Sequence, residues 1–335
     1  MKPLSTKLSA AAAALLLAAH PASAACPLAA VPDAQLAQVL RGHGVRTAGA
    51  PKAILFRSKM ARDDDGAPTA YHRGNADDSP DPGLDHICNG GDVLEFRNGS
   101  LTNKYAAGGS VGRLDGIDPA TGVRRSRLCK RDYIAVREAH FPTCGPSRLC
   151  MRFYGVAVEP RSCGFNKANE MGCGVPIRQR DASGNRLQFY LTRNILMRPN
   201  APNDSHQQSD YADASRIPFI VMPGGLALPG EMRWQAGDLA VVAAGGRTAY
   251  AVIGDSGPRT KLGEGSRALL QALGIAPTDD DSAVTTLLFP ETASQVTGPW
   301  PLDPATFKAK ARALLGALPG GAAALRECPG MSALE

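Results

Sequence analysis

Aromatic residues are scarce in this sequence, at 5% of its 335 positions, and several enzyme motifs are missing. There is no HExxH pair to bind zinc and no CxxC pair to begin a cysteine metal site. The serine in GDSGP, Ser256, does not stand in the GxSxG pattern of a nucleophile elbow. After residue 24 no apolar run is long enough to cross a bilayer. We therefore expect no metal, no cofactor and no membrane partner.

The N-terminus has the three parts of a secretory signal peptide. Lys2 and Lys7 supply the basic start, residues 10–19 form a short apolar run, and small residues end at Ala24. A lipoprotein would instead carry a lipid on Cys26, but the preceding SAA lacks the usual bulky residue. The sequence predicts a signal peptide over 1–24 and a secreted protein, either extracellular or periplasmic.

The charge of the chain is close to balanced, which argues against a nucleic-acid partner. The formal net charge of +6 is spread too evenly to predict a phosphate-binding surface. The densest basic stretch, 124–131, is interpreted as a solvated loop. We expect a monomer that does not bind nucleic acid.

Cysteine is plentiful after the predicted leader. The eight cysteines are an even number, which indicates disulfides in an exported chain. Five of them lie between Cys129 and Cys173, so we predict a disulfide-rich insertion over about 120–180. Cys26 and Cys328 lie near the two ends and are candidates to tie them together, while spacing leaves the other pairings open.

Short strands outnumber helices in the pattern of apolar residues. Residues 53–72 predict two strands around an acidic turn, 92–105 predict a hairpin at Asn98-Gly99, and further strands are expected at 187–197, 217–225 and on both sides of Gly245-Gly246. Helices are expected in 32–44, in 264–274 and in 303–318, where Asp303 caps the first turn. The sequence thus predicts a mainly β fold of the α+β kind, with a β-barrel-like core and a few peripheral helices.

Two acidic residues stand between small residues, one at the end of the strand that follows Gly245-Gly246 and the other at the start of the helix expected in 264–274. Asp255 lies in GDSG and Glu264, nine residues later, lies in GEGS. Glycoside hydrolysis uses such a pair, one carboxyl to protonate the leaving oxygen and one carboxylate to activate water or attack the sugar. The alternative is structural, with Asp255 in a turn and Glu264 favouring a helix N-terminus. Spacing alone does not decide between these interpretations.

Three segments resemble a known enzyme family. The stretch GDLAVV…AYAVIGDSGPRTKLGEGSRALLQALGI resembles the central motif of the fungal-type chitosanases, glycoside hydrolase family 75. Upstream, FYLTRNILM…DYADASRIPFIVMPGG and MARDDDGAPTAYH resemble segments that precede this motif in the family. The resemblance covers roughly residues 53–110 and 187–275, and the stretch from Cys129 to Cys173 has no counterpart in it.

The resemblance implies a secreted, endo-acting hydrolase of chitosan β-1,4 linkages that works by inversion on a double-psi β-barrel. The two essential acids of the family correspond to Asp255 and Glu264, and we expect Glu264 to be the acid and Asp255 the base. A polycationic substrate calls for a locally acidic groove. Candidate substrate-binding residues are Asp63, Asp65, Tyr71, Asp85, Tyr211 and Lys261.

The chain then divides into a signal peptide (1–24), one catalytic domain (25–318) containing the insertion, and a C-terminal tail (319–335). Alternatives remain: a hydrolase of chitin or of the peptidoglycan glycan, a non-catalytic polysaccharide-binding wall protein, or a secreted inhibitor or toxin built around the insertion. A calcium loop at 62–71 lacks the alternating oxygen ligands and the closing Glu.

Overall fold

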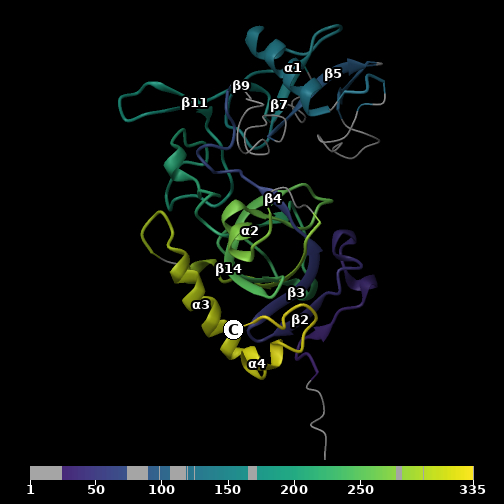
Figure 1. Cartoon of the computed structure of the whole chain (residues 1–335), viewed down its shortest axis with the longest axis vertical. Coiled ribbons are helices and arrows are strands. Elements are labelled where there is room, and N and C mark those ends of the chain that lie inside the picture. The colour runs from purple at the N-terminus through teal and green to yellow at the C-terminus, as the bar shows by residue number, and fades with distance from the viewer. Residues whose placement is uncertain are drawn as a thin grey trace, which may run out of the picture.

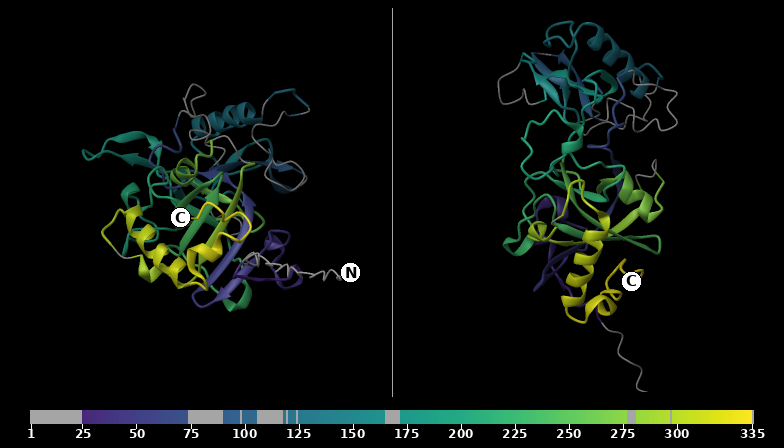
Figure 2. Two further views of the ribbon diagram at one scale, coloured as in Figure 1. Left: turned by 60° about the horizontal axis from the view of Figure 1, so that its bottom comes forward. Right: turned by 90° about the vertical axis from the view of Figure 1, so that its left-hand side faces the viewer.

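The computed structural model describes residues 25–73, 90–97, 99–105, 118, 120–123, 125–164, 172–276, 281–296 and 298–334. A β-barrel lies at the centre, the insertion lies at one end, and the C-terminal helices α3 and α4 pack on the barrel away from the insertion (Figures 1 and 2). The described residues therefore form a mainly β protein with few helices, as predicted.

The elements have the following bounds. The strands are β1 (Ala29–Ala30), β2 (Arg46–Gly49), β3 (Lys52–Lys59), β4 (Ala61–Asp63), β5 (Gly91–Arg97), β6 (Ser100–Asn103), β7 (Cys150–Phe153), β8 (Val158–Pro160), β9 (Gly174–Pro176), β10 (Arg178–Arg180), β11 (Arg186–Tyr190), β12 (Phe219–Pro223), β13 (Leu239–Ala244), β14 (Arg247–Gly257), β15 (Glu264–Ser266) and β16 (Ala283–Phe289). The helices are α1 (Arg125–Glu138), α2 (Arg267–Leu273), α3 (Pro304–Ala317) and α4 (Gly321–Leu325).

The main sheet closes on itself through one bent strand. Its order is β1-β2-β3-β16-β13-β14-β12-β15-β4, and only Met60 separates β3 from β4 in the chain. Because β3 pairs with β16 and β4 pairs with β15, this continuous stretch closes the strands from β3 to β4 into a ring, and β2 and β1 extend the sheet beyond β3. Closure removes exposed strand edges, which makes a barrel stable without a partner sheet.

Both faces of the barrel wall are buried. Along β13, Leu239 and Val241 belong to one hydrophobic cluster while Ala240 and Val242 belong to another, as the two-residue period of a strand requires. The β13–β14 hairpin turns at Gly245-Gly246, both with positive φ, as the sequence predicts. Near-continuous apolar runs are typical of strands covered on both sides.

The two predicted helices near the C-terminus are confirmed. Ser266 caps α2 by accepting from the Leu269 N–H, and Gly274 ends the helix with φ of 71°. Asp303 caps α3 by accepting from the Ala305 N–H, as expected. The buried face of α3 consists of Phe307, Ala311 and Leu315.

The insertion is a separate small sheet with its own helix. The predicted hairpin at 98–99 is present as β5 and β6, but β5 also pairs with β7, so the insertion begins near residue 90 rather than 120. Disulfides Cys144–Cys150 and Cys163–Cys173 brace it, and Cys129 is also disulfide-bonded. Disulfides in the described residues are consistent with an oxidising compartment.

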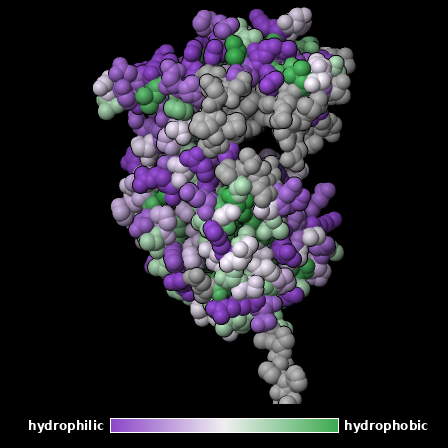
Figure 3. Space-filling model, viewed as in Figure 1, coloured by the Kyte–Doolittle hydropathy of each residue, from purple (hydrophilic) through white to green (hydrophobic). Residues whose placement is uncertain are grey.

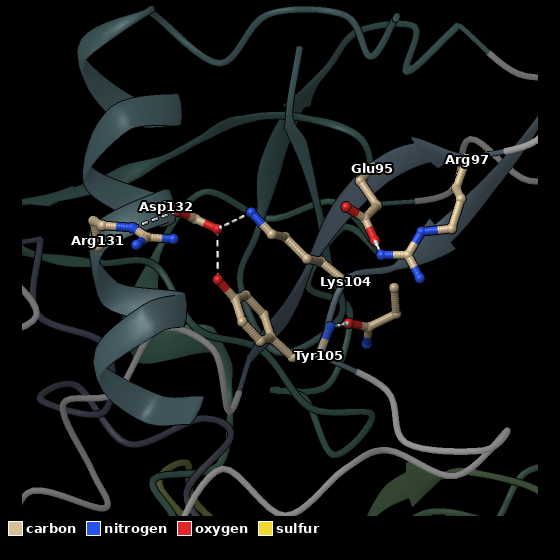
Figure 4. A network of polar contacts seen from close by, with 7 residues as sticks. Glu95, Arg97, Lys104, Tyr105, Arg131 and Asp132 are labelled. Carbon is tan, nitrogen blue, oxygen red and sulfur yellow. Dashed lines mark hydrogen bonds and ion pairs between the residues drawn. The ribbon is translucent and has the colours of Figure 1, made fainter. Parts of the chain in front are cut away.

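Helix α1 carries the polar network that joins this helix to the hairpin. Asp132 accepts from Lys104, Tyr105 and Arg131, and Arg97 pairs with Glu95 nearby (Figure 4). Although burial opposes it, hydrogen bonds from these three partners lower the pKa of Asp132. The network fixes α1 against β6.

Several local predictions are wrong. In the basic stretch 124–131, the described residues 125–131 are part of helix α1, whose buried residues include Cys129, Tyr133 and Val136. Residues 32–44 hold two 3₁₀ turns, Asp33–Gln35 and Gln38–Leu40, instead of an amphipathic helix. After the acidic turn, the described residues up to 73 form only an isolated bridge, His72 to Phe189, in place of a second strand.

The ends of the chain are fastened together. The disulfide Cys26–Cys328 closes a separation of 302 residues, which confirms the proposed link. The segment described as a tail is packed against the domain, since Leu325, Met331 and Leu334 are at most 2% exposed. Among the described residues no helix is long and apolar enough to cross a membrane, and the predicted signal peptide lies outside them.

Candidate active site

Asp255 reaches the site because strand β14 contains a bulge. In the pairing of β12 with β14, Ile220 lies opposite Ile253 but Val221 lies opposite Asp255, so Gly254 is the extra residue. An added residue moves every later side chain to the other face of the sheet. Glycine fits here because a Cβ on Gly254 would lie 2.2 Å from the Phe219 ring.

Glu264 lies on the other side of the same residue. Strand β15 pairs with β12 so that Glu264 is opposite Val221. Residues paired directly across strands point to one face, and Val221 therefore has an acid on each side. The Lys261 ammonium lies 2.5 Å from the Glu264 carboxylate and faces it as a counter-charge.

The Glu264 side chain extends over β12 toward β14. A Cβ built on Gly257 would lie 2.7 Å from Glu264 Oε2, so this oxygen lies directly above Gly257. Gly257 is two residues beyond Asp255 on the same strand, and two residues of a strand span about 7 Å. Strand geometry thus places the two carboxyl groups on one face of the sheet, with Gly257 about 7 Å along β14 from Asp255.

Two more carboxylates join from strand β4. Ala61 pairs with Glu264 and Asp63 pairs with Ser266, which places Asp63 on the face of Glu264. The next acid, Asp64, is 8% exposed and forms an ion pair with Arg62 at 2.8 Å. Only the outer members of the DDD triplet, Asp63 and Asp65, therefore belong to the site.

The three aspartates form a compact group. Asp63, Asp65 and Asp255 each offer one carboxylate oxygen, and these three oxygens lie within 4.8 Å of one another. Oxygen atoms so placed are the ligands that hard divalent cations prefer. Glu264 is not part of this group of three.

Burial is the main cause of the raised pKa values of these three aspartates. It raises the pKa of Asp63, Asp65 and Asp255 well above the usual aspartate value, and repulsion between the carboxylates raises them further. Asp255 is partly compensated, since its Oδ1 accepts from the backbone N–H of Ile195 and of Ser256 at 3.2 and 2.7 Å. The group therefore holds protons at a pH where an exposed aspartate has lost its own.

Asp65 is held in place by contacts from three segments. Its Oδ1 accepts from the Tyr71 hydroxyl at 2.5 Å, and its backbone carbonyl accepts from Asn194 at 2.9 Å. Gly155 packs against it so closely that a Cβ there would lie 2.2 Å from Asp65 Oδ1. The following Gly66, with φ of 95°, leaves room for Asn194. These contacts fix the carboxylate before any ligand arrives.

The structure brings together most of the predicted site residues. Tyr71 supports Asp65 and Lys261 pairs with Glu264, as described above. Tyr211 is 3% exposed and donates to the Ser205 carbonyl, so its ring packs inside the domain. Asp85 lies outside the described residues.

Two residues at the site were not predicted. Tyr154 is 49% exposed and follows β7, directly before the Gly155 that contacts Asp65. Ile195 is 42% exposed, and its N–H donates to Asp255. Their positions depend on contacts between distant segments, and the only local sign is Gly155 next to the tyrosine.

No protein-family model matches the chain, and no curated protein matches it either. The chemistry of the site rests on its own geometry. Two acids stand on one face of a rigid sheet, on either side of Val221, one of them within the group of three aspartates and the other beside a lysine. This arrangement can deliver a proton from one side of a bond and activate a water molecule on the other.

Proposed function

We propose that this protein is a secreted glycoside hydrolase that cleaves β-1,4 linkages of chitosan with inversion, as a member of the fungal-type chitosanase family on a double-psi β-barrel. The observation that carries the proposal is the placement of Asp255 and Glu264 on either side of Val221. The closed sheet, with parallel pairs β12–β14 and β15–β4, supports the fold.

The acidic surroundings suit an amino-sugar substrate. Chitosan carries protonated amines in mild acid, and a group of half-buried aspartates attracts such a cation. An ammonium beside Asp63 and Asp65 favours the ionised forms of these two carboxyl groups. Neutral chitin gains nothing from this attraction.

The geometry favours roles for the two acids that are the reverse of those expected from the sequence. Asp255 holds a proton because burial and its neighbours raise its pKa, and Oδ1 takes both backbone hydrogen bonds, which leaves Oδ2 to carry the proton. Glu264 has Lys261 as its counter-charge. We therefore assign Asp255 as the acid that protonates the leaving oxygen and Glu264 as the base that removes a proton from the attacking water.

The test is hydrolysis of a panel of glycans by the purified protein at mildly acidic pH. We expect reducing ends to be released from soluble chitosan, little or no release from chitin or peptidoglycan glycan, and a first product of inverted anomeric configuration. Release of reducing ends only from peptidoglycan or only from chitin would show that this glycan, and not chitosan, is the substrate. No release from any glycan by the folded protein would favour the non-catalytic wall protein.

A further inference from the structure

Tyr154 stands on rigid backbone at the edge of the carboxylate group. It directly follows β7, where its neighbour Phe153 is only 2% exposed, yet half of Tyr154 is open to solvent. The N–H groups of Tyr154 and Gly155 both donate to the Gly90 carbonyl, at 2.9 and 3.2 Å. The Gly155 carbonyl accepts from the Thr192 hydroxyl at 2.7 Å. An exposed aromatic residue in so fixed a segment is ready to bind without further ordering.

Tyr154 is next to Gly155 in the chain, and it also lies close enough to the carboxylates of the site for their charge to affect it. Partial burial of the side chain, followed by the carboxylates of Asp92, Asp65 and Glu264, raises the pKa of Tyr154. The hydroxyl therefore stays protonated and remains a hydrogen-bond donor. Among the described residues it has no hydrogen-bond partner, which leaves this donor available to a ligand.

Two exposed apolar residues lie beside the carboxylates. The large apolar residues exposed in the described chain are Phe96, Val123, Tyr154, Leu187 and Ile195. Tyr154 adjoins the residue that touches Asp65, and Ile195 binds Asp255 through its N–H, so two of the five border the acids. Elsewhere on the insertion, Figure 3 shows isolated hydrophobic residues among many hydrophilic ones.

A pyranose ring has an apolar face of C–H groups and a rim of hydroxyls. The face packs on an aromatic ring, while the rim needs hydrogen-bond donors and acceptors. Tyr154 offers a ring and a donor, and the aspartates offer acceptors. A free metal ion would leave the exposed ring unused.

We propose that Tyr154 is a sugar-stacking residue that packs on the pyranose ring next to the cleaved linkage. The cysteine-rich insertion then forms one wall of the substrate site rather than an independent module. This inference rests on the proposed function, since it requires a sugar polymer between Tyr154 and the acids. It gives the insertion, which has no counterpart in the family resemblance, a role in choosing and holding the substrate.

The test measures binding without turnover. In a Glu264→Gln background, calorimetry with a chitosan hexamer compares Tyr154→Ala with Phe96→Ala, a change to an aromatic residue of similar exposure on the same insertion. We expect Tyr154→Ala to weaken Kd by about tenfold, and Phe96→Ala to leave it unchanged. In the active protein the same loss should appear mainly in KM.

Two further variants keep the test decisive. Tyr154→Phe and Tyr154→Trp retain a ring, so both should bind within about threefold of the parent, even where Tyr154→Ala lowers the melting temperature. If the parent binds the hexamer and Tyr154→Ala binds it equally well, the stacking role is wrong while the proposed function stands. If the folded parent binds no glycan, both the proposed function and this inference fail.

Discussion

Asp255 and Glu264 face the same side of the sheet because each pairs with Val221 of the strand between them. The bulge at Gly254 brings Asp255 opposite Val221 and so turns its side chain to this face. Without it, Asp255 would point to the opposite face, among the residues that surround Ile253. The acid pair is thus a product of strand register, and several consequences of its geometry are measurable.

The assigned roles predict which variant a small nucleophile rescues. In Glu264→Ala the base is missing, and azide can attack the anomeric carbon in place of water while Asp255 still protonates the leaving oxygen. We expect azide to restore turnover and to give a glycosyl azide of inverted configuration. In Asp255→Ala the proton donor is missing, and azide should not help. Rescue of Asp255→Ala alone would reverse the two roles.

Glycines that touch the acids should be needed for activity more than for folding. A Cβ atom at position 155 would clash with the Asp65 carboxylate. A Cβ atom at position 257 would clash with Glu264 Oε2. We expect Gly155→Ala and Gly257→Ala to lower kcat by about tenfold or more, since small displacements of catalytic groups are costly. Gly49→Ala, which would meet no atom within 4 Å, is the control. Equal activity in all three variants would contradict the described packing of the acids.

Asp255 and Asp132 should affect stability in opposite directions. The pKa of Asp255 is raised on folding, so its ionisation destabilises the fold as pH rises above the value for the unfolded chain. Asp255→Asn should therefore stabilise the protein at pH 7 by on the order of 1 kcal/mol, and this gain should vanish near pH 3–4.

The pKa of Asp132 is lowered on folding, so the stability it contributes is present above the unfolded value and is lost as pH falls through the folded value. Asp132→Asn should cost about 1–3 kcal/mol at neutral pH. Denaturant unfolding at pH 7 and pH 4 checks both variants. A destabilising Asp255→Asn at pH 7 would show that its carboxylate is a structural group.

The sequence was informative where local pattern decides the structure. Apolar runs around Gly245-Gly246 predicted β13 and β14, and Asp303 predicted the start of α3. Helix α1 was missed because its many arginines suggested a solvated loop. The helical spacing of Cys129, Tyr133 and Val136 was the signal that would have revealed it.

Long-range pairing set the features that could not be predicted. The bulge at Gly254 depends on how β14 meets β12, and the closure of the barrel depends on β4 joining β15. Tyr154 is at the site because Gly155 packs on Asp65. None of these features leaves a periodic trace in the sequence. The acidic triplet illustrates the limit, since the pairing of Asp63 with β15, the contacts of Tyr71 and Gly155 with Asp65 and the ion pair of Asp64 with Arg62 all involve other segments or side chains.

The central claim is that Asp255 and Glu264 act together on a glycosidic bond. The most direct test is reducing-end release from chitosan by the wild-type protein beside Asp255→Asn and Glu264→Gln, with folding of all three checked by thermal unfolding. The account predicts release by the wild type and a loss of about a hundredfold or more in each variant. A folded variant that retained wild-type activity would contradict it.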